Sequence, residues 1–138
     1  MDIEVTFPGG KRVDARWPGF NVATDQPTDL GGEGSAPAPY DLFLASLATC
    51  AGIYALGFCQ ARGLPTEGLT LRQNVELDPT THLASTVTLT VTPPVGFPEK
   101  YLGALEKVVA GCKVKKSLGA PPAFIVRIQK EEASCAVV

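Results

Sequence analysis

Four cysteines, at positions 50, 59, 112 and 135, are the residues of this sequence best suited to chemistry. A cysteine thiolate is a nucleophile and a soft metal ligand, so the set could form a redox pair, a hydrolase nucleophile or a metal site. No two cysteines have the Cys-x-x-Cys spacing of a metal site, and the single histidine, His82, is a poor candidate for a hydrolase base because it falls in an expected hairpin turn. We therefore expect no metal and no cofactor, and both structural packing and thiol redox chemistry stay open for these cysteines.

Cys50 and Cys112 have different surroundings in the sequence. Cys50 lies in an uncharged run, about ten residues from the expected start of a helix, where the helix dipole no longer lowers a thiol pKa. A buried structural cysteine is the plain alternative for this position. Cys112 is followed by Lys113, Lys115 and Lys116, whose ammonium groups favour a thiolate. Local sequence thus favours Cys112 as the more activated thiol, and a helix-end cysteine beside a solvated basic patch is its structural alternative.

The other two cysteines receive no functional role. Cys59 follows Cys50 by nine residues and therefore lies nearly opposite to it on a helix. Cys135 belongs to a C-terminal tail, where order is usually low.

Hydrophobic periodicity and turn residues predict nine elements in one domain, residues 1–138. A first hairpin (3–7 and 12–17), a short strand (20–24) and a loop (25–38) precede a long apolar helix at 39–62. A second hairpin (69–77 and 84–92), a helix from Pro98 to near Gly111, a helical turn (114–118) and a last strand (124–128) follow. The order βββ-α-ββ-α-β predicts an α+β fold with a mostly antiparallel sheet around the long helix.

Composition and charge restrict the partners and the compartment. The hydrophobic fraction of 45% and the charged fraction of 19% are those of a globular protein. A net charge of −2 with a pI near 5.3 does not indicate the excess of positive charge that nucleic-acid binding needs. The first residues lack the basic and apolar regions of a secretory signal, so we expect a cytoplasmic protein. Cysteines are usually kept reduced there.

The long helix also requires a comparison with a membrane span. Residues 42–59 contain no charged side chain and approach the length of a spanning helix, roughly 18 residues or more. The run includes Ser46, Thr49 and two glycines, and no tryptophan or basic cluster flanks it. We therefore expect a helix that protein surrounds on every side, and no membrane association.

Two cysteine motifs resemble those of the OsmC and organic hydroperoxide resistance superfamily. Residues 38–50, APYDLFLASLATC, resemble its first-cysteine helix, and Cys112-Lys113-Val114 followed by Leu118 resembles its second-cysteine motif. The predicted order of elements matches as well. The resemblance implies an intertwined homodimer in which the long helix is buried across the subunit interface.

The resemblance also implies a reaction. In the peroxidase members the first cysteine attacks an organic hydroperoxide, becomes a sulfenic acid and is resolved by the second, so these roles fall on Cys50 and Cys112. The implied function is that of a thiol-dependent peroxidase in oxidative stress defence, with a small organic hydroperoxide as substrate and an unknown thiol reductant. The alternative is a non-catalytic small-molecule-binding or stress-associated protein on the same scaffold.

Two further site residues follow from the resemblance. Hydroperoxidases of the superfamily place a glutamate ten residues before the first cysteine, where this chain has Tyr40, whereas Asp41 fits the OsmC-like branch, whose acid lies one position later. The superfamily also places an arginine near the first strands. Arg16 is the expected match, with Arg12 and Lys11 as rivals.

Overall fold

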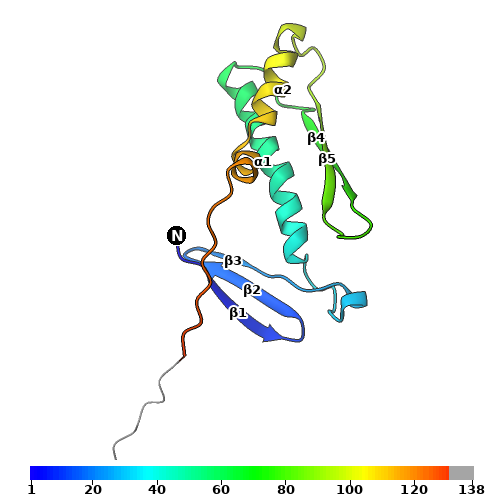
Figure 1. Ribbon diagram of the computed structural model, residues 1–138. Helices are drawn as coiled ribbons and strands as arrows, with labels where there is room; N and C mark the ends of the chain where they lie inside the picture. Colours follow the sequence, from blue (N-terminus) through cyan, green and yellow to red (C-terminus); the bar gives the residue numbers. More distant parts are fainter. Residues whose placement is uncertain (131–138) are drawn as a thin grey trace, which may run out of the picture.

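The computed structural model describes residues 1–130 and places helices and strands almost where the sequence predicts them (Figure 1). Strands β1 (Glu4–Gly9), β2 (Arg12–Trp17) and β3 (Phe20–Val22) come first, followed by the 3₁₀ helix η1 (Thr28–Leu30) and the helix α1 (Pro39–Ala61). Strands β4 (Thr70–Leu77) and β5 (Ala84–Thr92), the 3₁₀ helix η2 (Glu99–Tyr101) and the helices α2 (Leu102–Ala110) and α3 (Lys113–Gly119) complete the fold. The predicted α+β class is confirmed.

The strands form two separate antiparallel sheets instead of one sheet around the helix. β1, β2 and β3 form the first sheet, and β4 pairs with β5 in the second. In the first, the β1–β2 turn uses Gly9 and Gly10 at φ angles of 139° and 58°, which favour glycine. Figure 1 shows this sheet beyond the N-terminal end of α1, whereas the β4–β5 hairpin lies along the helix.

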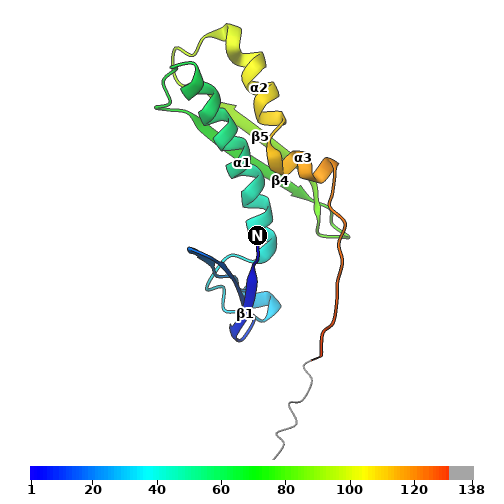
Figure 2. The ribbon, with the colours of Figure 1, turned by 90° about the vertical axis from the view of Figure 1, so that its left-hand side faces the viewer.

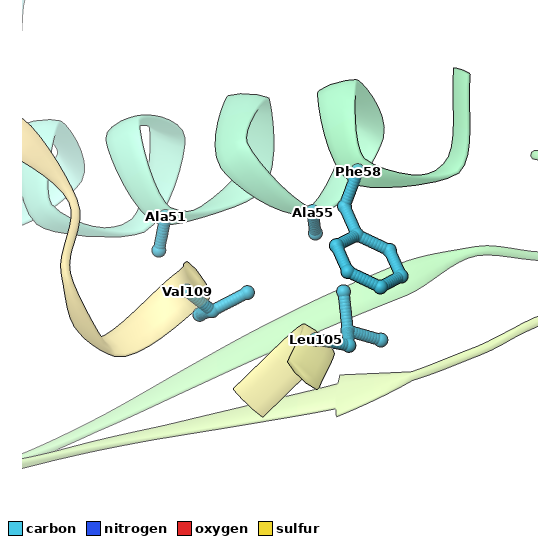
Figure 3. Close-up of a cluster of buried hydrophobic side chains, with 5 residues drawn as sticks. All are labelled: Ala51, Ala55, Phe58, Leu105 and Val109. Carbon is cyan, nitrogen blue, oxygen red and sulfur yellow. The ribbon is translucent and has the colours of Figure 1, made fainter. Parts of the chain in front are cut away.

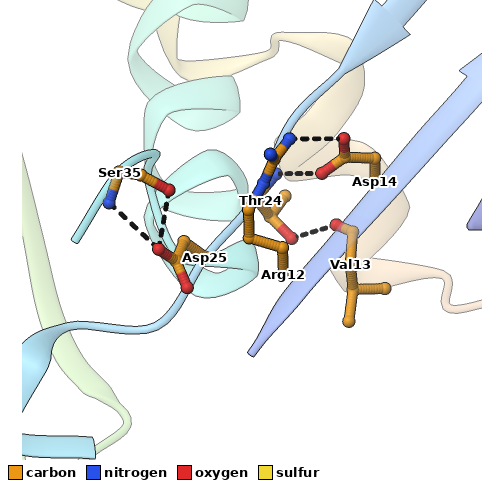
Figure 4. Close-up of polar contacts among 6 residues, drawn as sticks. All are labelled: Arg12, Val13, Asp14, Thr24, Asp25 and Ser35. Atoms are coloured by element: carbon orange, nitrogen blue, oxygen red, sulfur yellow. Dashed lines mark hydrogen bonds and ion pairs between the residues drawn. The ribbon is translucent and has the colours of Figure 1, made fainter. Parts of the chain in front are cut away.

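Buried carboxylates organise the segment that joins the first sheet to α1 (Figure 4). Asp25, only 1% exposed, accepts hydrogen bonds from the backbone N–H groups of Gln26, Glu33 and Ser35 and from the Ser35 hydroxyl at 2.7 Å. These bonds lower the pKa of Asp25 to about 2, with the Ser35 hydroxyl as the largest cause. Asp14 accepts from the Thr24 backbone N–H. The segment therefore has a fixed shape although it lacks long regular elements.

The core lies between α1, α2 and the β4–β5 hairpin (Figures 2 and 3). Its buried side chains come from the two helices and are Ala51, Ala55, Phe58, Leu105 and Val109. The small Ala51 and Ala55 allow α2 to approach α1 closely, and residues such as Leu71 and Leu89 of the hairpin close the cluster from the sheet side. This packing holds α2, and α3 after it, against the middle of α1.

One side of α1 stays uncovered in a single chain. Its length and composition are sufficient to cross a membrane, a property that the core helix of a soluble protein shares, and 28% of its most apolar window is buried. Ala45, Thr49, Ile53 and Gly57, spaced by one helical turn, are all exposed. The expectation that protein surrounds the helix on every side is therefore not met within one chain.

The last predicted strand, 124–128, is not formed. Residues 120–130 run as extended chain away from the rest of the molecule, and Phe124, Ile125, Val126 and Ile128 are each at least 76% exposed (Figures 1 and 2). A strand needs a neighbouring edge for its N–H and C=O groups, and no strand edge lies beside this segment in the described chain. Its apolar strand-like sequence remains unpaired.

Candidate functional site

The structure places Cys50 and Cys112 next to each other. Cys50 is a partly buried residue in the middle of α1, and Cys112 is fully buried at the residue that precedes α3. Both are free thiols, and the Cys112 thiol is one of the groups that lower the pKa of the Cys50 thiol. Residues 62 positions apart in the sequence thus form one dithiol site.

The surroundings of Cys50 favour its thiolate. The backbone N–H of Val114 makes the largest contribution to a lowered pKa of the Cys50 thiol, and burial opposes it. The Cys112 thiol, the backbone N–H of Lys113 and the positive charge of Lys115 lower this pKa further. Hydrogen bonds and cations stabilise the charged form of an acid, so Cys50 is the thiol prepared for nucleophilic attack.

The turn between α2 and α3 positions the groups that act on Cys50. Gly111 ends α2 by donating its N–H to the Lys107 and Val108 carbonyl oxygens, and the chain then starts α3 immediately after Cys112. The Lys116 N–H closes the first turn on the Cys112 carbonyl oxygen at 3.0 Å. Lys115 donates from Nζ to the Val109 carbonyl oxygen at 2.6 Å, which holds its ammonium group in place near the dithiol.

Asp41 and Arg16 are not brought to Cys50 within the chain. Asp41 caps the start of α1, where it accepts a hydrogen bond from the Ala38 N–H at 3.0 Å, and it lies about 13 Å from Cys50 along the helix axis, at ~1.5 Å per residue. Arg16 forms an exposed ion pair with Glu4 at 3.0 Å in the separate first sheet. In this chain, both residues have structural contacts.

The rivals of Arg16 and the residue at the superfamily's glutamate position also have other contacts. Arg12 pairs with Asp14 at 2.8 Å, and Lys11 is exposed in the β1–β2 turn. The Tyr40 hydroxyl accepts a hydrogen bond from the Ala84 N–H at 2.8 Å. Tyr40 thereby fixes the β4–β5 hairpin to the first turn of α1.

Sequence reasoning missed the backbone donors of Val114 and Lys113. It also attributed the effect of the nearby lysines to Cys112, whereas in the fold the charge of Lys115 acts on Cys50. The only available signal was the start of a helical turn directly after Cys112, since backbone N–H groups are free in the first turn of a helix. Of the remaining cysteines, Cys59 is buried and free, and Cys135 lies outside the described residues.

A groove of about 460 Å³ lies between β5 and α2. Its lining is mainly apolar, with a charge of each sign, and consists of Val87, Leu89, Val91, Pro93, Leu102, Leu105, Glu106, Val109, Ala110 and Lys115. Lys115 belongs both to this lining and to the surroundings of Cys50. In residues 1–130, no three histidine, cysteine or acidic side chains gather where they could hold a metal ion.

Comparison with known families decides the classification of this dithiol fold. The sequence model for OsmC-like proteins matches residues 32–127, which include both cysteines of the site. The chain belongs to the OsmC-like family. A search of curated proteins finds no match.

Solved structures agree with this membership. An osmotic stress induced and detoxification response protein of Psychrobacter arcticus is 25% identical, with a TM-score of 0.72 over 83% of this chain and 85% of that one. An organic hydroperoxide resistance protein OsmC of Legionella pneumophila is 20% identical, with a TM-score of 0.56 over 85% and 87%. An OsmC like protein of Mycoplasma pneumoniae is 16% identical, with a TM-score of 0.60 over 87% of both chains. The last two likenesses concern the fold alone.

Proposed function

We propose that this OsmC-like protein is a cytoplasmic thiol-dependent peroxidase that reduces organic hydroperoxides. The observation that supports it is the activated dithiol: the Val114 and Lys113 N–H groups and the Cys112 thiol lower the pKa of the Cys50 thiol. Family membership and the structural likeness to an osmotic stress induced and detoxification response protein support a stress-related role.

The proposed reaction uses the two thiols in sequence. The Cys50 thiolate attacks the terminal oxygen of the hydroperoxide, the O–O bond breaks, and the alkoxide takes a proton and leaves as an alcohol. Cys50 is then a sulfenic acid. The Cys112 sulfur attacks the Cys50 sulfur, and the sulfenic oxygen leaves as water with the Cys112 proton. Two electrons have passed from the dithiol to the peroxide, and a disulfide remains for an external thiol to reduce.

The groove favours an organic substrate over hydrogen peroxide. Its mainly apolar lining includes Lys115, whose charge also acts on the Cys50 thiol. A carbon tail that enters it gains about 0.8 kcal/mol per buried methylene, whereas hydrogen peroxide gains nothing. Substrate preference should therefore grow with the size of the alkyl group.

Single-turnover oxidation with cumene hydroperoxide tests the proposal. Cys50→Ser should lose sulfenic acid formation completely, and Cys112→Ser should form a sulfenic acid that persists because no resolving thiol is near. Cys59→Ala is the matched control, since Cys59 is a buried cysteine of the same helix, and it should keep the wild-type oxidation rate within about twofold. Equal, slow reaction of wild type and Cys50→Ser, at the rate of a free thiol, would refute the peroxidase.

A homodimer is part of the proposal. The uncovered side of α1, the isolated first sheet and the unpaired segment 120–130 all leave apolar or hydrogen-bonding groups without partners in one chain. In the intertwined homodimer that the family resemblance implies, we propose that the first sheet of the second copy lies at the dithiol. Arg16 of that copy is then the candidate cation for the Cys50 thiolate.

The groove also favours the alternative function, binding of a small apolar molecule without turnover. A hydrophobic fluorescent probe distinguishes the two: the binding protein should hold it equally well in the reduced protein and after the dithiol has been oxidised. A peroxidase should instead bind cumyl alcohol, the product of cumene hydroperoxide reduction, weakly and release it after each turnover.

A further inference from the structure

Positive charge is concentrated at the corner where α2 meets α3. Residues 107–116 contain four lysines and no acidic residue, so this segment carries +4. The net charge of the chain is −2, and the remainder therefore carries −6, the difference between these two values. We call Lys107, Lys113, Lys115 and Lys116 the lysine corner.

The lysine corner flanks Cys112 on both sides in the sequence, the charge of Lys115 acts on Cys50, and no ion pair neutralises the four lysines within residues 1–130. Lys107, Lys113 and Lys116 are exposed, and Lys115 is partly buried. Within residues 1–130, none of the four has a carboxylate at ion-pair distance, because the only ion pairs there join Arg12 to Asp14 and Arg16 to Glu4. A solute that approaches Cys50 or Cys112 at this corner therefore meets a positive field.

Access to the two sulfurs is unequal. Cys112 is fully buried, whereas Cys50 is only partly buried. Because Cys50 is the more exposed of the two residues, we take its sulfur as the one that an incoming nucleophile attacks in a Cys50–Cys112 disulfide, with Cys112 as the leaving group. Because Cys50 is partly buried, a small thiol suits this approach better than a large one.

We propose that the lysine corner recruits a small thiol carrying negative charge as the reductant of the oxidised protein. The inference rests on the proposed function, whose reductant it specifies by chemical class. The first thiolate attacks the Cys50 sulfur, the Cys50–Cys112 bond breaks, and the electron pair and a proton go to Cys112. A second thiolate attacks the outer sulfur of the mixed disulfide and releases Cys50 as a thiolate. Two thiols become one disulfide, and the dithiol is restored.

The physical basis is electrostatic attraction in a partly solvated site. Several lysines near the site raise the local concentration of an anion about fivefold at low ionic strength, even with the dielectric screening of water. Added salt reduces the effect, because the Debye length is about 10 Å at 0.1 M and only 3 Å at 1 M. The preference should therefore appear in the rate of reduction and decrease with salt.

The experiment measures the reductive half-reaction alone. Diamide produces the Cys50–Cys112 disulfide without a peroxide, and stopped-flow kinetics follow its reduction by 2-mercaptoethanesulfonate, 2-mercaptoethanol and cysteamine, which have similar sizes and different charges. Each rate is corrected for the thiolate fraction and divided by the rate with 2-hydroxyethyl disulfide. For wild type at low salt, the corrected rate with the sulfonate should exceed that with the neutral thiol about fivefold, and the rate with cysteamine should be the lowest. In 1 M salt the three corrected rates should become equal.

Variants locate the effect on the surface. In Lys113→Gln/Lys116→Gln the preference for the sulfonate over the neutral thiol should fall to about twofold, and in Lys113→Glu/Lys116→Glu it should reverse. Lys100→Gln/Lys130→Gln is the matched control, which removes the same charge from exposed lysines outside the corner and should leave the preference unchanged. A preference that is absent in wild type, unaffected by salt or equal in all variants would overturn this inference while leaving the peroxidase intact. Failure of diamide to join Cys50 to Cys112 would overturn both.

Discussion

At the scale of residues, Cys50 obtains its reactivity from a distant part of the chain. Its position deep in α1 leaves it without help from that helix's own N-terminus, and the N–H groups that reach it belong to the first turn of α3. Cys112 contributes both a hydrogen-bond donor and the second sulfur. In the proposed reaction, Cys112 thus both lowers the pKa of the Cys50 thiol and attacks the sulfenic acid that forms on Cys50.

The pH dependence of alkylation should report this environment. Because the pKa of Cys50 is lowered, its reaction with iodoacetamide, followed at the Cys50 peptide by mass spectrometry, should reach half-maximal rate below the pH of about 8.5 expected for an ordinary thiol. Cys112→Ala removes the thiol donor and should move this midpoint upward, whereas Cys112→Ser retains a donor and should move it less. Lys115→Gln should also raise it. A midpoint at 8.5 in the wild type, or equal midpoints for the Ala and Ser variants, would contradict this account.

At the scale of elements, the segment from Asp25 to Ser35 is held by one buried carboxylate. The pKa of Asp25 is about 2 in the folded protein, below its ordinary value of 3.8, so its charged form stabilises the fold. That contribution is complete above pH 3.8 and is lost as the pH falls toward 2. Its loss would free the segment that leads into α1, because Asp25 accepts hydrogen bonds from residues on both sides of η1.

Asp25→Asn should therefore lower the urea midpoint of unfolding at pH 6, and the difference from wild type should shrink between pH 4 and pH 2. The amide offers one acceptor oxygen and no charge to the donors that Asp25 satisfies. Asp29→Asn is the control, since it removes an exposed carboxylate from the same segment. Equal midpoints for all three proteins at pH 6, at one protein concentration, would show that the carboxylate does not hold this segment.

The elements that could be predicted from the sequence are those with local causes. Helix 39–62 was predicted within one residue of α1 because Pro39 starts it and Gly63 ends it, and both hairpins followed from alternation and turn residues. The strand 124–128 has the same local pattern but lacks a neighbouring strand in the described chain, so pattern alone failed there. In the site, the pairing of Cys50 with Cys112 came from family resemblance. The Val114 donor depends on tertiary packing that no sequence window contains.

At the scale of the whole molecule, the chain exposes more surface than a folded monomer should. Its accessible surface is 10736 Å², whereas a monomeric protein of 14.5 kDa exposes about 6,900 Å². Part of the excess belongs to the extended residues 120–130, and part to the open side of α1 and to the first sheet. Obligate homodimers bury about 2,000–5,000 Å² in total, so a second copy would account for a large part of the excess.

Light scattering should give about twice 14.5 kDa at micromolar concentration. Ile53, 58% exposed in the middle of the uncharged side of α1, is the position where a charge should matter most. Ile53→Glu should shift the protein toward monomer or unfold it, because burying an unpaired carboxylate against an apolar helix face is costly. Val95→Glu is the matched control: Val95 is fully exposed in the turn before η2, and its replacement should leave the mass unchanged. A 14.5 kDa wild-type protein, or an Ile53→Glu variant with unaltered mass and stability, would show that α1 is not covered by a second copy.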